Sequence, residues 1–263
     1  MLNKIIKLGI MLIVIGIGFL YTEKTIYLVR KYDPVMKKIN EVKDNYYAQP
    51  VSAHIDDNYY TPGIPGESVD LDKSYLNMKK NGIYDENLLV FTQIDNENKY
   101  DYSKYISKIN SKAKTISIIV KITDSRNIDE LINTLNSKKI KVNFFIKEGV
   151  VSNDILNYIK RSNHNIYTYI DNSSESIKEA NYCLFEKEDA YLLNYCRENK
   201  LISLLPNIIG ESNLFSAVKN KLKYGSIILI NDINDISNIK TSIDFIRQKG
   251  LNIVELEEHL SNI

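Results

Sequence analysis

The stretch "TISIIVKITDSRNIDELINTLNSKKIKVNFFI", residues 115–146, decides the fold class. It opens with a β-branched run at residues 115–122, which is typical of a strand buried on both faces. Apolar residues then recur at helical spacing over residues 128–135, and Asn127 with Glu130 predicts a capping pair at the start of that helix. The segment "KVNFFI" reads as the next strand. The order strand, helix, strand predicts a βαβ unit.

The same alternation continues toward the C-terminus. Further strands are predicted in "NIYTYI", "NYCLF", "LISLL", "GSIILI" and "NIVEL", with amphipathic helical segments between them. Alternating strands and helices predict right-handed crossovers, and therefore a parallel sheet or a (β/α) barrel. In either architecture, ligand chemistry belongs at the carboxyl ends of the strands.

Composition limits the classes of function. Of the 263 residues, 44% are hydrophobic, which is enough for a substantial core. The formal net charge is +1, from 34 basic and 33 acidic residues, and neither sign forms a long run. Nucleic-acid binding requires a concentrated basic surface, so we expect no nucleic-acid partner.

Residues 1–30 have the pattern of a membrane anchor. An uncharged apolar run, residues 8–21, follows Lys4 and Lys7, and no small-residue cleavage site comes after it. The prediction is an uncleaved signal anchor that crosses the cell membrane once. Basic residues flank both sides of the run, so charge alone does not decide which side of the membrane the rest of the chain faces.

Three further segments follow the anchor. Residues 31–62 are polar and are predicted to form a stalk with one short helix. Residues 63–112 are predicted to form a small N-terminal module, with a helix capped by Asp70 or Asp72 and a buried strand in "NLLVFTQI". Residues 113–263 form the main α/β domain.

The two cysteines, Cys183 and Cys196, allow one disulfide and no zinc finger. Cys183 lies in an apolar run and Cys196 in a helical one. That setting favours two buried thiols that behave as small hydrophobic side chains.

Carboxylates and amides stand where the predicted strands end. These residues are Asp124, Asp171, Asn231, Asp232 and Asp235. The simplest interpretation of such residues is that they cap helices and shape solvated loops. The alternative is that several of them converge on one site.

The order of segments over residues 113–263 resembles the polysaccharide deacetylases of the NodB-homology group, carbohydrate esterase family 4. "KKIKVNFFI" is similar to the second strand of that family, "SNHNI" is similar to its "AGHEI", and "YGSIILIND" with "RQKGLNIVEL" is similar to its closing segments. The resemblance implies a distorted (β/α) barrel. The reaction that it implies is metal-dependent N-deacetylation of a carbohydrate, a hydrolysis of a non-peptide C–N bond.

The catalytic motifs of that family are replaced in this sequence. The family's T-F-D-D-G, which supplies a general base and a metal ligand, reads "KITDSR", with one match at Asp124. Its two metal-binding histidines fall on Tyr169 and Ser173, and its last catalytic histidine falls on Asn231. The segment that aligns with its Arg-Pro-Pro-Tyr-Gly motif lies near "FEKED", without an arginine. Catalytic zinc needs about three protein ligands, so we expect the zinc site to be lost and no other cofactor to replace it.

His164, one of only three histidines in the chain, stands in "SNHNI" and is a candidate metal ligand by residue type. It matches the histidine of the family's "AGHEI", at a helix-to-strand junction, and neither of the family's metal ligands. We therefore predict a structural role for His164.

Two functions follow as hypotheses. In the first, the chain is a membrane-anchored, catalytically inactive protein of the cell envelope, with its C-terminal domain outside the cell, that binds cell-wall glycan or an envelope protein. The residues predicted to contact that ligand are Tyr167, Tyr169, Asp171, Asn231 and Asp235. A purely structural, membrane-tethered spacer is not distinguished from this hypothesis by the sequence.

In the second hypothesis, the chain is a carbohydrate-active hydrolase with a rebuilt carboxylate site. Asp124 and Asp232 are then the catalytic candidates, and Asp171 and Asp235 join them at the strand ends. Oxygen ligands alone would suit magnesium, calcium or manganese, and a pair of carboxylates would suit hydrolysis of a glycosidic bond.

Overall fold

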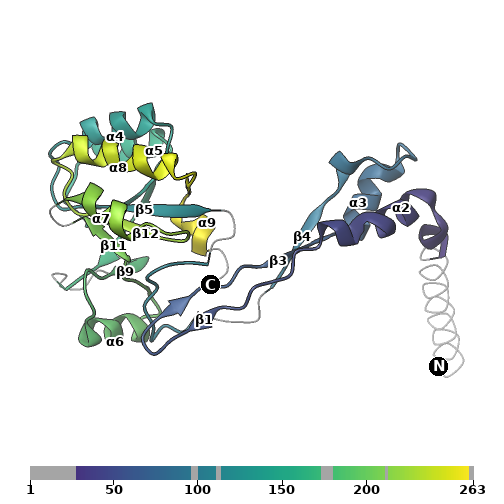
Figure 1. Ribbon diagram of the computed structural model, residues 1–263, viewed down its shortest axis with the longest axis horizontal. Coiled ribbons are helices and arrows are strands. Elements are labelled where there is room, and N and C mark those ends of the chain that lie inside the picture. The colour runs from purple at the N-terminus through teal and green to yellow at the C-terminus, as the bar shows by residue number, and fades with distance from the viewer. Residues whose placement is uncertain (1–27, 96–99, 111–113, 173–179, 211–212, 261–263) are drawn as a thin grey trace, which may run out of the picture. The chain divides into compact units, whose positions relative to one another are not determined.

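The computed structural model describes residues 28–95, 100–110, 114–172, 180–210 and 213–260 (Figure 1). The chain divides into two units, Met1–Pro50 with Pro65–Asp95, and Val51–Ile64 with Asn96–Ile263. We call them the N-terminal unit and the sheet unit. The predicted membrane anchor lies almost entirely outside the described residues. No helix within the described ranges combines the length and the apolar character needed to cross a membrane.

In its described residues, the N-terminal unit combines helices α2 (Pro34–Val42) and α3 (Leu71–Lys79) with a two-stranded sheet. Helix α2 packs on α3, and β3 (Gly66–Val69) pairs antiparallel with β4 (Phe91–Ile94). Short 3-10 turns occupy Lys43–Tyr46 and Glu86–Leu88. Of the two predicted caps for α3, Asp70 is the one used, because its side chain accepts a hydrogen bond from the Lys73 amide at 3.0 Å.

The segment "NLLVFTQI" does not form the buried strand that was predicted. Its first residues form the second 3-10 turn, and its strand, β4, is exposed at three of four positions. The only described partner of β4 is β3, and its exposed side chains show that its faces are not covered as those of a buried strand would be.

The predicted stalk is divided between the two units. Its first part includes α2, while its last part forms a hairpin of β1 (His54–Ile55) and β2 (Tyr60–Thr61) in the sheet unit. Tyr60 is fully buried there, with its ring 5.1 Å from that of Tyr100. Packing holds these residues in place, although their polar composition had predicted a stalk.

The sheet unit has the predicted parallel α/β architecture. Its main sheet has the order β11-β12-β5-β6-β7, with every pair parallel, and β13 also pairs with β5. A second parallel sheet has the order β10-β9-β8. The strands are β5 (Thr115–Ile122), β6 (Asn143–Ile146), β7 (Asn165–Tyr167), β8 (Tyr169–Ile170), β9 (Tyr182–Leu184), β10 (Ile202–Leu204), β11 (Ile208–Gly210), β12 (Ile227–Ile230) and β13 (Asn252–Ile253).

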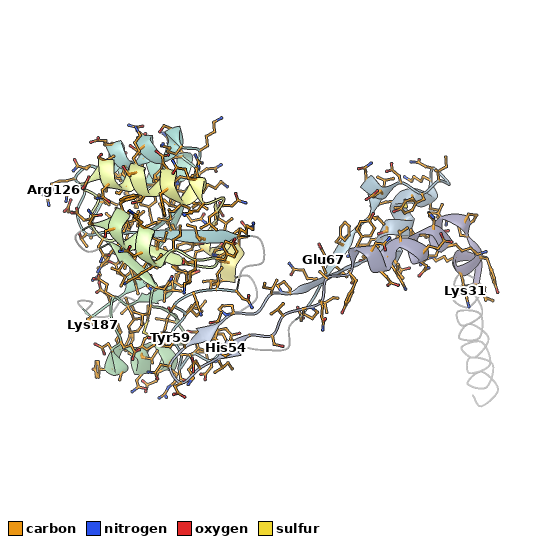
Figure 2. The ribbon with its side chains drawn as sticks, viewed as in Figure 1. Lys31, His54, Tyr59, Glu67, Arg126 and Lys187 are labelled. Atoms are coloured by element: carbon orange, nitrogen blue, oxygen red, sulfur yellow. A yellow bond between two sulfur atoms is a disulfide. The ribbon has the colours of Figure 1, made fainter. Side chains whose placement is uncertain are left out.

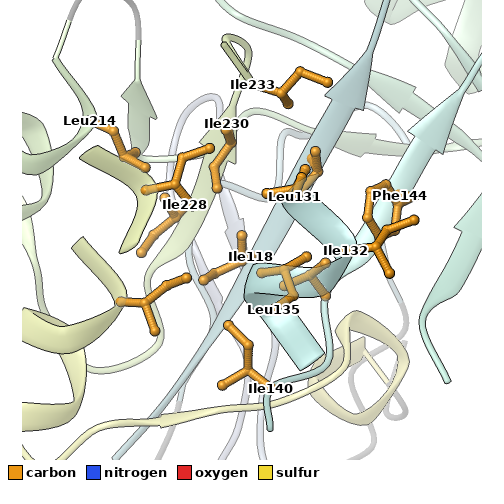
Figure 3. Close-up of a cluster of buried hydrophobic side chains, with 14 of the residues drawn as sticks. Ile118, Leu131, Ile132, Leu135, Ile140, Phe144, Leu214, Ile228, Ile230 and Ile233 are labelled. Atoms are coloured by element: carbon orange, nitrogen blue, oxygen red, sulfur yellow. The ribbon is translucent and has the colours of Figure 1, made fainter. Parts of the chain in front are cut away.

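Helices connect the strands of the sheet unit. They are α4 (Ile128–Ser137), α5 (Asn153–Arg161), α6 (Ala190–Glu198), α7 (Leu214–Lys221), α8 (Ile236–Gln248) and α9 (Leu256–Leu260). Figure 1 shows α4, α5 and α8 together over one side of the main sheet, and α4 contacts both of the others. Isoleucine and leucine side chains fill the layer between these helices and the sheet (Figure 3).

Alternate residues of each strand face opposite sides of the sheet. In β5, Ile116, Ile118, Val120 and Ile122 pack in the helix-covered layer. Ile119 belongs instead to a second buried cluster, which is rich in aromatic rings and includes Phe145, Tyr169 and Leu184. We call the side of that second cluster the inner face. This alternation determines which side chains meet where the strands end.

Several local predictions about the sheet unit need correction. Asn127 precedes α4 in the left-handed conformation, with φ 59°, and its side chain makes no capping bond to the helix. It donates instead to the Asn234 side chain at 3.0 Å, so the predicted capping pair is absent. The predicted strand "NIYTYI" is two strands, β7 and β8, separated at Thr168 and paired into different sheets. Strand β11 was not predicted.

Cys183 and Cys196 form a disulfide, so the interpretation as two free thiols is wrong. Packing of α6 on the second sheet brings the Cα atoms of the two residues to 6.3 Å, within the range that a disulfide spans. Neither residue has measurable solvent exposure.

Candidate functional site

Four charged side chains extend the inner face at the carboxyl ends of four strands. Lys121, Lys147, Asp171 and Glu186 each follow by two positions an inward-facing residue, namely Ile119, Phe145, Tyr169 and Leu184. Because side chains alternate along a strand, this spacing directs all four to the same side of the sheets. We call these four residues the strand-end cluster.

The strand-end cluster is held by ion pairs. The Lys121 Nζ lies 3.2 Å from Asp171 Oδ2 and 2.7 Å from Glu186 Oε1. The Lys147 Nζ lies 2.6 Å from Asp171 Oδ1. The Asp171 side chain is 12% exposed and that of Lys121 is 14% exposed, so the pair that they form is largely shielded from water, whereas the Glu186 side chain is 42% exposed.

Both lysines also lie over one aromatic ring. The Nζ of Lys121 is 5.9 Å and that of Lys147 is 5.5 Å from the ring centre of Tyr169, which is within cation–π range. Burial alone would lower the pKa of Lys121, but the hydrogen bonds and charges of Glu186 and Asp171 outweigh burial and raise it. Lys121 therefore remains a charged ammonium at the centre of the cluster.

The two tyrosines predicted to contact a ligand are buried. Tyr169 has no exposed surface and Tyr167 is 7% exposed. The ring of Tyr167 packs against Phe145 and Tyr182, with ring centres 5.6 and 5.1 Å away. Burial raises the pKa of both hydroxyls. The Tyr169 ring lies beneath the two lysines of the strand-end cluster, and neither tyrosine presents a face to a ligand.

The remaining predicted site residues are engaged locally. Asp124 pairs with Arg126 at 2.9 Å on the surface, where Figure 2 shows Arg126 projecting from the unit. Asp232 accepts hydrogen bonds from the backbone and side chain of Asn234, both at 2.9 Å. Asp235 caps α8 by accepting from the Asn238 amide. These are the helix-capping and loop roles that were the simpler interpretation.

Asn231 directly follows β12 and is partly buried. Its Oδ1 atom is buried without a hydrogen-bond partner among the described residues. Ser173, the second position aligned with a family histidine, lies outside the described residues.

The side chains at the strand ends do not suit a zinc ion. Both carboxylate oxygens of Asp171 face lysine ammonium groups, and Tyr169 is a buried phenol. Within the described ranges, no group of three or more His, Cys, Asp or Glu side chains is arranged to hold a metal. An ammonium donates hydrogen bonds and cannot ligate a cation, so this set lacks the donors that zinc requires.

His164 has the structural role that was predicted for it. It is 4% exposed, its Nδ1 accepts a hydrogen bond from the Val142 amide at 3.3 Å, and its ring packs edge-on against Phe144. Burial lowers its pKa to about 4, so the ring is neutral. It closes the junction between α5 and β7.

The strand-end cluster was missed because its two lysines look like interruptions of apolar strands. The signal was nevertheless present in the alternation of side chains. Once the inner face of each strand is assigned, counting two residues onward from Ile119 and Phe145 reaches Lys121 and Lys147.

Comparison with known proteins agrees with this fold. No protein-family model matches the sequence. The uncharacterized protein YlxY of Bacillus subtilis (strain 168) is 22% identical over 135 residues, which is 50% of this chain. That match covers 42% of the length of the B. subtilis protein.

Solved structures give a wider match. The structure of wild-type BA3943, described as a CE4 family pseudoenzyme from Bacillus anthracis, superposes with a TM-score of 0.60 at 16% identity. The superposition covers 87% of this chain and 95% of that one. A BA3943 mutant described as having restored enzymatic activity gives the same TM-score and covers 98% of its chain. The sheet unit thus has, in divergent form, the polysaccharide deacetylase fold of carbohydrate esterase family 4.

Proposed function

We propose that this chain is a catalytically inactive, glycan-binding protein of the cell envelope, built on the deacetylase fold. The observation that carries the proposal is the strand-end cluster. Ligand chemistry in this architecture belongs at the carboxyl ends of the strands, and there the chain places two lysine ammonium groups paired with Asp171 and Glu186.

The strand-end cluster is unsuited to metal-dependent hydrolysis. That reaction needs a cation to activate water and to polarise the scissile carbonyl. Lys121 and Lys147 already neutralise the carboxylates that could attract a cation, and a divalent ion beside them would meet two positive charges. The other carboxylate candidates, Asp124 and Asp232, are engaged in local turns. The donor chemistry therefore favours a binding role over the alternative of a rebuilt hydrolase.

The disulfide supports a location outside the cell. Disulfides persist in oxidising compartments and are rare where glutathione and thioredoxin keep thiols reduced. The buried bond between Cys183 and Cys196 thus favours export of the sheet unit, which the charges around the N-terminal apolar run left open. We propose that residues 1–30 anchor the chain in the membrane and that the sheet unit faces out. Protease added to intact cells should then digest the sheet unit, whereas protection until lysis would contradict this orientation.

An activity assay tests the inactive state. We expect the full chain to release no acetate from N-acetylglucosamine oligomers, with or without added zinc, cobalt or manganese. Metal-dependent acetate release that is lost in D124A or D232A would instead establish a rebuilt hydrolase. Sedimentation with insoluble peptidoglycan tests glycan binding separately. A chain that stays in the supernatant would remove the glycan function and leave an envelope protein as the partner.

A further inference from the structure

A pocket of about 260 Å³ opens beside the strand-end cluster. It is lined by residues 170–172 at the end of β8 and by Asp189, Tyr191, Leu192 and Tyr195 at the start of α6. Drug-sized ligands occupy pockets of about 300–1,000 Å³, so this one suits a smaller group such as a single ring. None of the tyrosines that the sequence singled out lines it.

Tyr191 gives the pocket an aromatic wall. Its side chain is 89% exposed, more than any other exposed large hydrophobic residue described. Tyr195 stands four residues later, one turn along the same side of α6. An exposed ring at the edge of a pocket offers a flat apolar face, on which the C–H face of a sugar can stack while its hydroxyls stay free to hydrogen bond.

The polar side of the pocket is held in place before any ligand arrives. Asp189 caps α6 by accepting from the Leu192 amide at 2.9 Å, and its other oxygen accepts from Asn172 Nδ2 at 2.9 Å. The Asp189 amide donates a hydrogen bond to the Tyr105 hydroxyl oxygen at 2.9 Å. Asp171 is fixed by its two lysines. Groups that are already oriented lose little entropy on binding.

The charges around the pocket favour a neutral ligand that donates hydrogen bonds. Two lysines and two carboxylates compensate one another within the strand-end cluster. The negative charge of Asp189 lies at the N-terminus of α6, where the helix dipole stabilises it. What remains available on Asp189 and Asn172 is acceptor capacity, which suits the hydroxyl groups of a sugar.

The disulfide ties this helix to the sheet. Cys196 lies on α6 one residue after Tyr195, and its bond to Cys183 fixes α6 to β9. The helix that carries Tyr191 is therefore held covalently to β9, the strand that pairs with β8 beside the pocket.

We propose that this pocket binds one sugar ring of a neutral glycan, stacked on Tyr191 and hydrogen-bonded to Asp189 and Asn172. The proposal rests on the glycan-binding function above and adds where the sugar binds. It places the ligand on α6, beside the ion pairs, and leaves the strand-end cluster intact.

The test is co-sedimentation of the full chain with insoluble peptidoglycan, and calorimetry with an N-acetylglucosamine tetrasaccharide. We expect Y191A to weaken binding at least about tenfold, the equivalent of 1.4 kcal/mol. Y191F should bind as the unchanged chain does, because stacking needs the ring and not the hydroxyl. Tyr224, which is 54% exposed and does not line the pocket, supplies the control Y224A, with binding unchanged.

The outcomes separate the two proposals. If the unchanged chain binds peptidoglycan and Y191A binds equally well, the pocket assignment is overturned and the glycan function stands. If Y191F loses binding as Y191A does, stacking is overturned in favour of a contact through the hydroxyl. If the unchanged chain binds neither glycan, both proposals fail together. Circular dichroism of each variant checks folding, which the exposure of Tyr191 should leave unaffected.

Discussion

The Lys121 ammonium lies 3.2 Å from the Asp171 carboxylate, although the two residues stand at the ends of strands 50 positions apart in sequence. Both side chains are more than four-fifths buried. Asp171 is shared, because its other oxygen lies 2.6 Å from Lys147. One carboxylate thus compensates two ammonium groups in a poorly solvated place, and its removal should disturb the fold more than the removal of either lysine.

We therefore expect D171N to lower the free energy of unfolding by about 3 kcal/mol, because breaking a buried ion pair leaves uncompensated charge. K121M should cost less, since Lys147 still pairs with Asp171. Urea unfolding followed by circular dichroism measures both. D124N is the control, because Asp124 pairs with neighbouring Arg126 at the surface, and it should change stability little.

A combination of variants tests the mechanism of that loss. In the K121M background, D171N should cost less than it does alone, because one of the stranded ammonium groups is gone. Equal losses in both backgrounds would mean that the two side chains act independently, contrary to the ion-pair account.

The disulfide makes a separate contribution to the stability of the folded chain. Cys183 and Cys196 are 13 positions apart, and closing a loop of about 15 residues stabilises a folded chain by about 3 kcal/mol through the unfolded state. C183A/C196A should lose stability of that order, as urea unfolding would report. Reductant should act slowly on the folded chain, since both residues are fully buried. Rapid thiol release without any change in the unfolding midpoint would contradict this role.

Patterning was enough to predict the parallel α/β core. The β-branched run that became β5 and the helical spacing that became α4 depend only on neighbours in sequence and on burial. Contacts between distant segments were not predictable in the same way. Cys183 and Cys196 become neighbours only when α6 folds back on β9, and nothing in either local sequence marks that contact.

In the candidate site, too, positions along the chain could be predicted, whereas side-chain directions and partners could not. Tyr167 and Tyr169 were predicted as ligand contacts within one strand, but the direction of their side chains was not known, and they point into the inner face. The carboxylates were correctly placed in loops, yet each found its partner within a few residues or on an adjoining strand end. Tyr191 had no distinguishing sequence signal, because its exposure comes from the position of α6 on the second sheet.

Two buried histidines make stability depend on pH. The His259 ring lies 2.9 Å from Ser117 Oγ and 2.7 Å from Thr115 Oγ1. Because the Ser117 hydroxyl donates to the Val254 carbonyl, Nδ1 must carry the proton of the neutral ring. Burial lowers the pKa of both His259 and His164 to about 4, from an ordinary value of 6.5.

The sign of the effect follows from proton uptake. Well above pH 6.5 the rings are neutral in the folded and unfolded chain, so their contribution is constant. As the pH falls from 6.5 toward 4, only the unfolded chain takes up protons, and stability declines by at most about 1.4 kcal/mol per pH unit for each histidine. Urea unfolding between about pH 7 and about pH 5 should show this loss. H259Q should reduce the slope, while H54Q, at an exposed hairpin position, should leave it in place.

Two glycines with nearly the same backbone conformation separate conformational strain from packing. Gly225 has φ +74° and Gly250 has φ +71°, both in the left-handed region that favours glycine. A Cβ at Gly250 would meet nothing within 4 Å, whereas one at Gly225 would lie 1.8 Å from the Ile109 carbonyl oxygen. Gly225 also exchanges backbone bonds with its surroundings, accepting from the Ile109 amide and donating to the Thr115 carbonyl, both at 2.9 Å.

G250A should therefore cost about 1 kcal/mol, the strain of a left-handed alanine. G225A should cost about 3 kcal/mol or more, because the backbone can relieve the clash only by breaking its bonds to Ile109 and Thr115. Thermal and urea unfolding of the two variants give the difference directly. Similar losses for both would mean that the segment around Ile109 yields easily and does not brace the start of β12. A much larger loss of stability for G225A would show that the close backbone contact between Gly225 and Ile109 is a rigid part of the sheet unit.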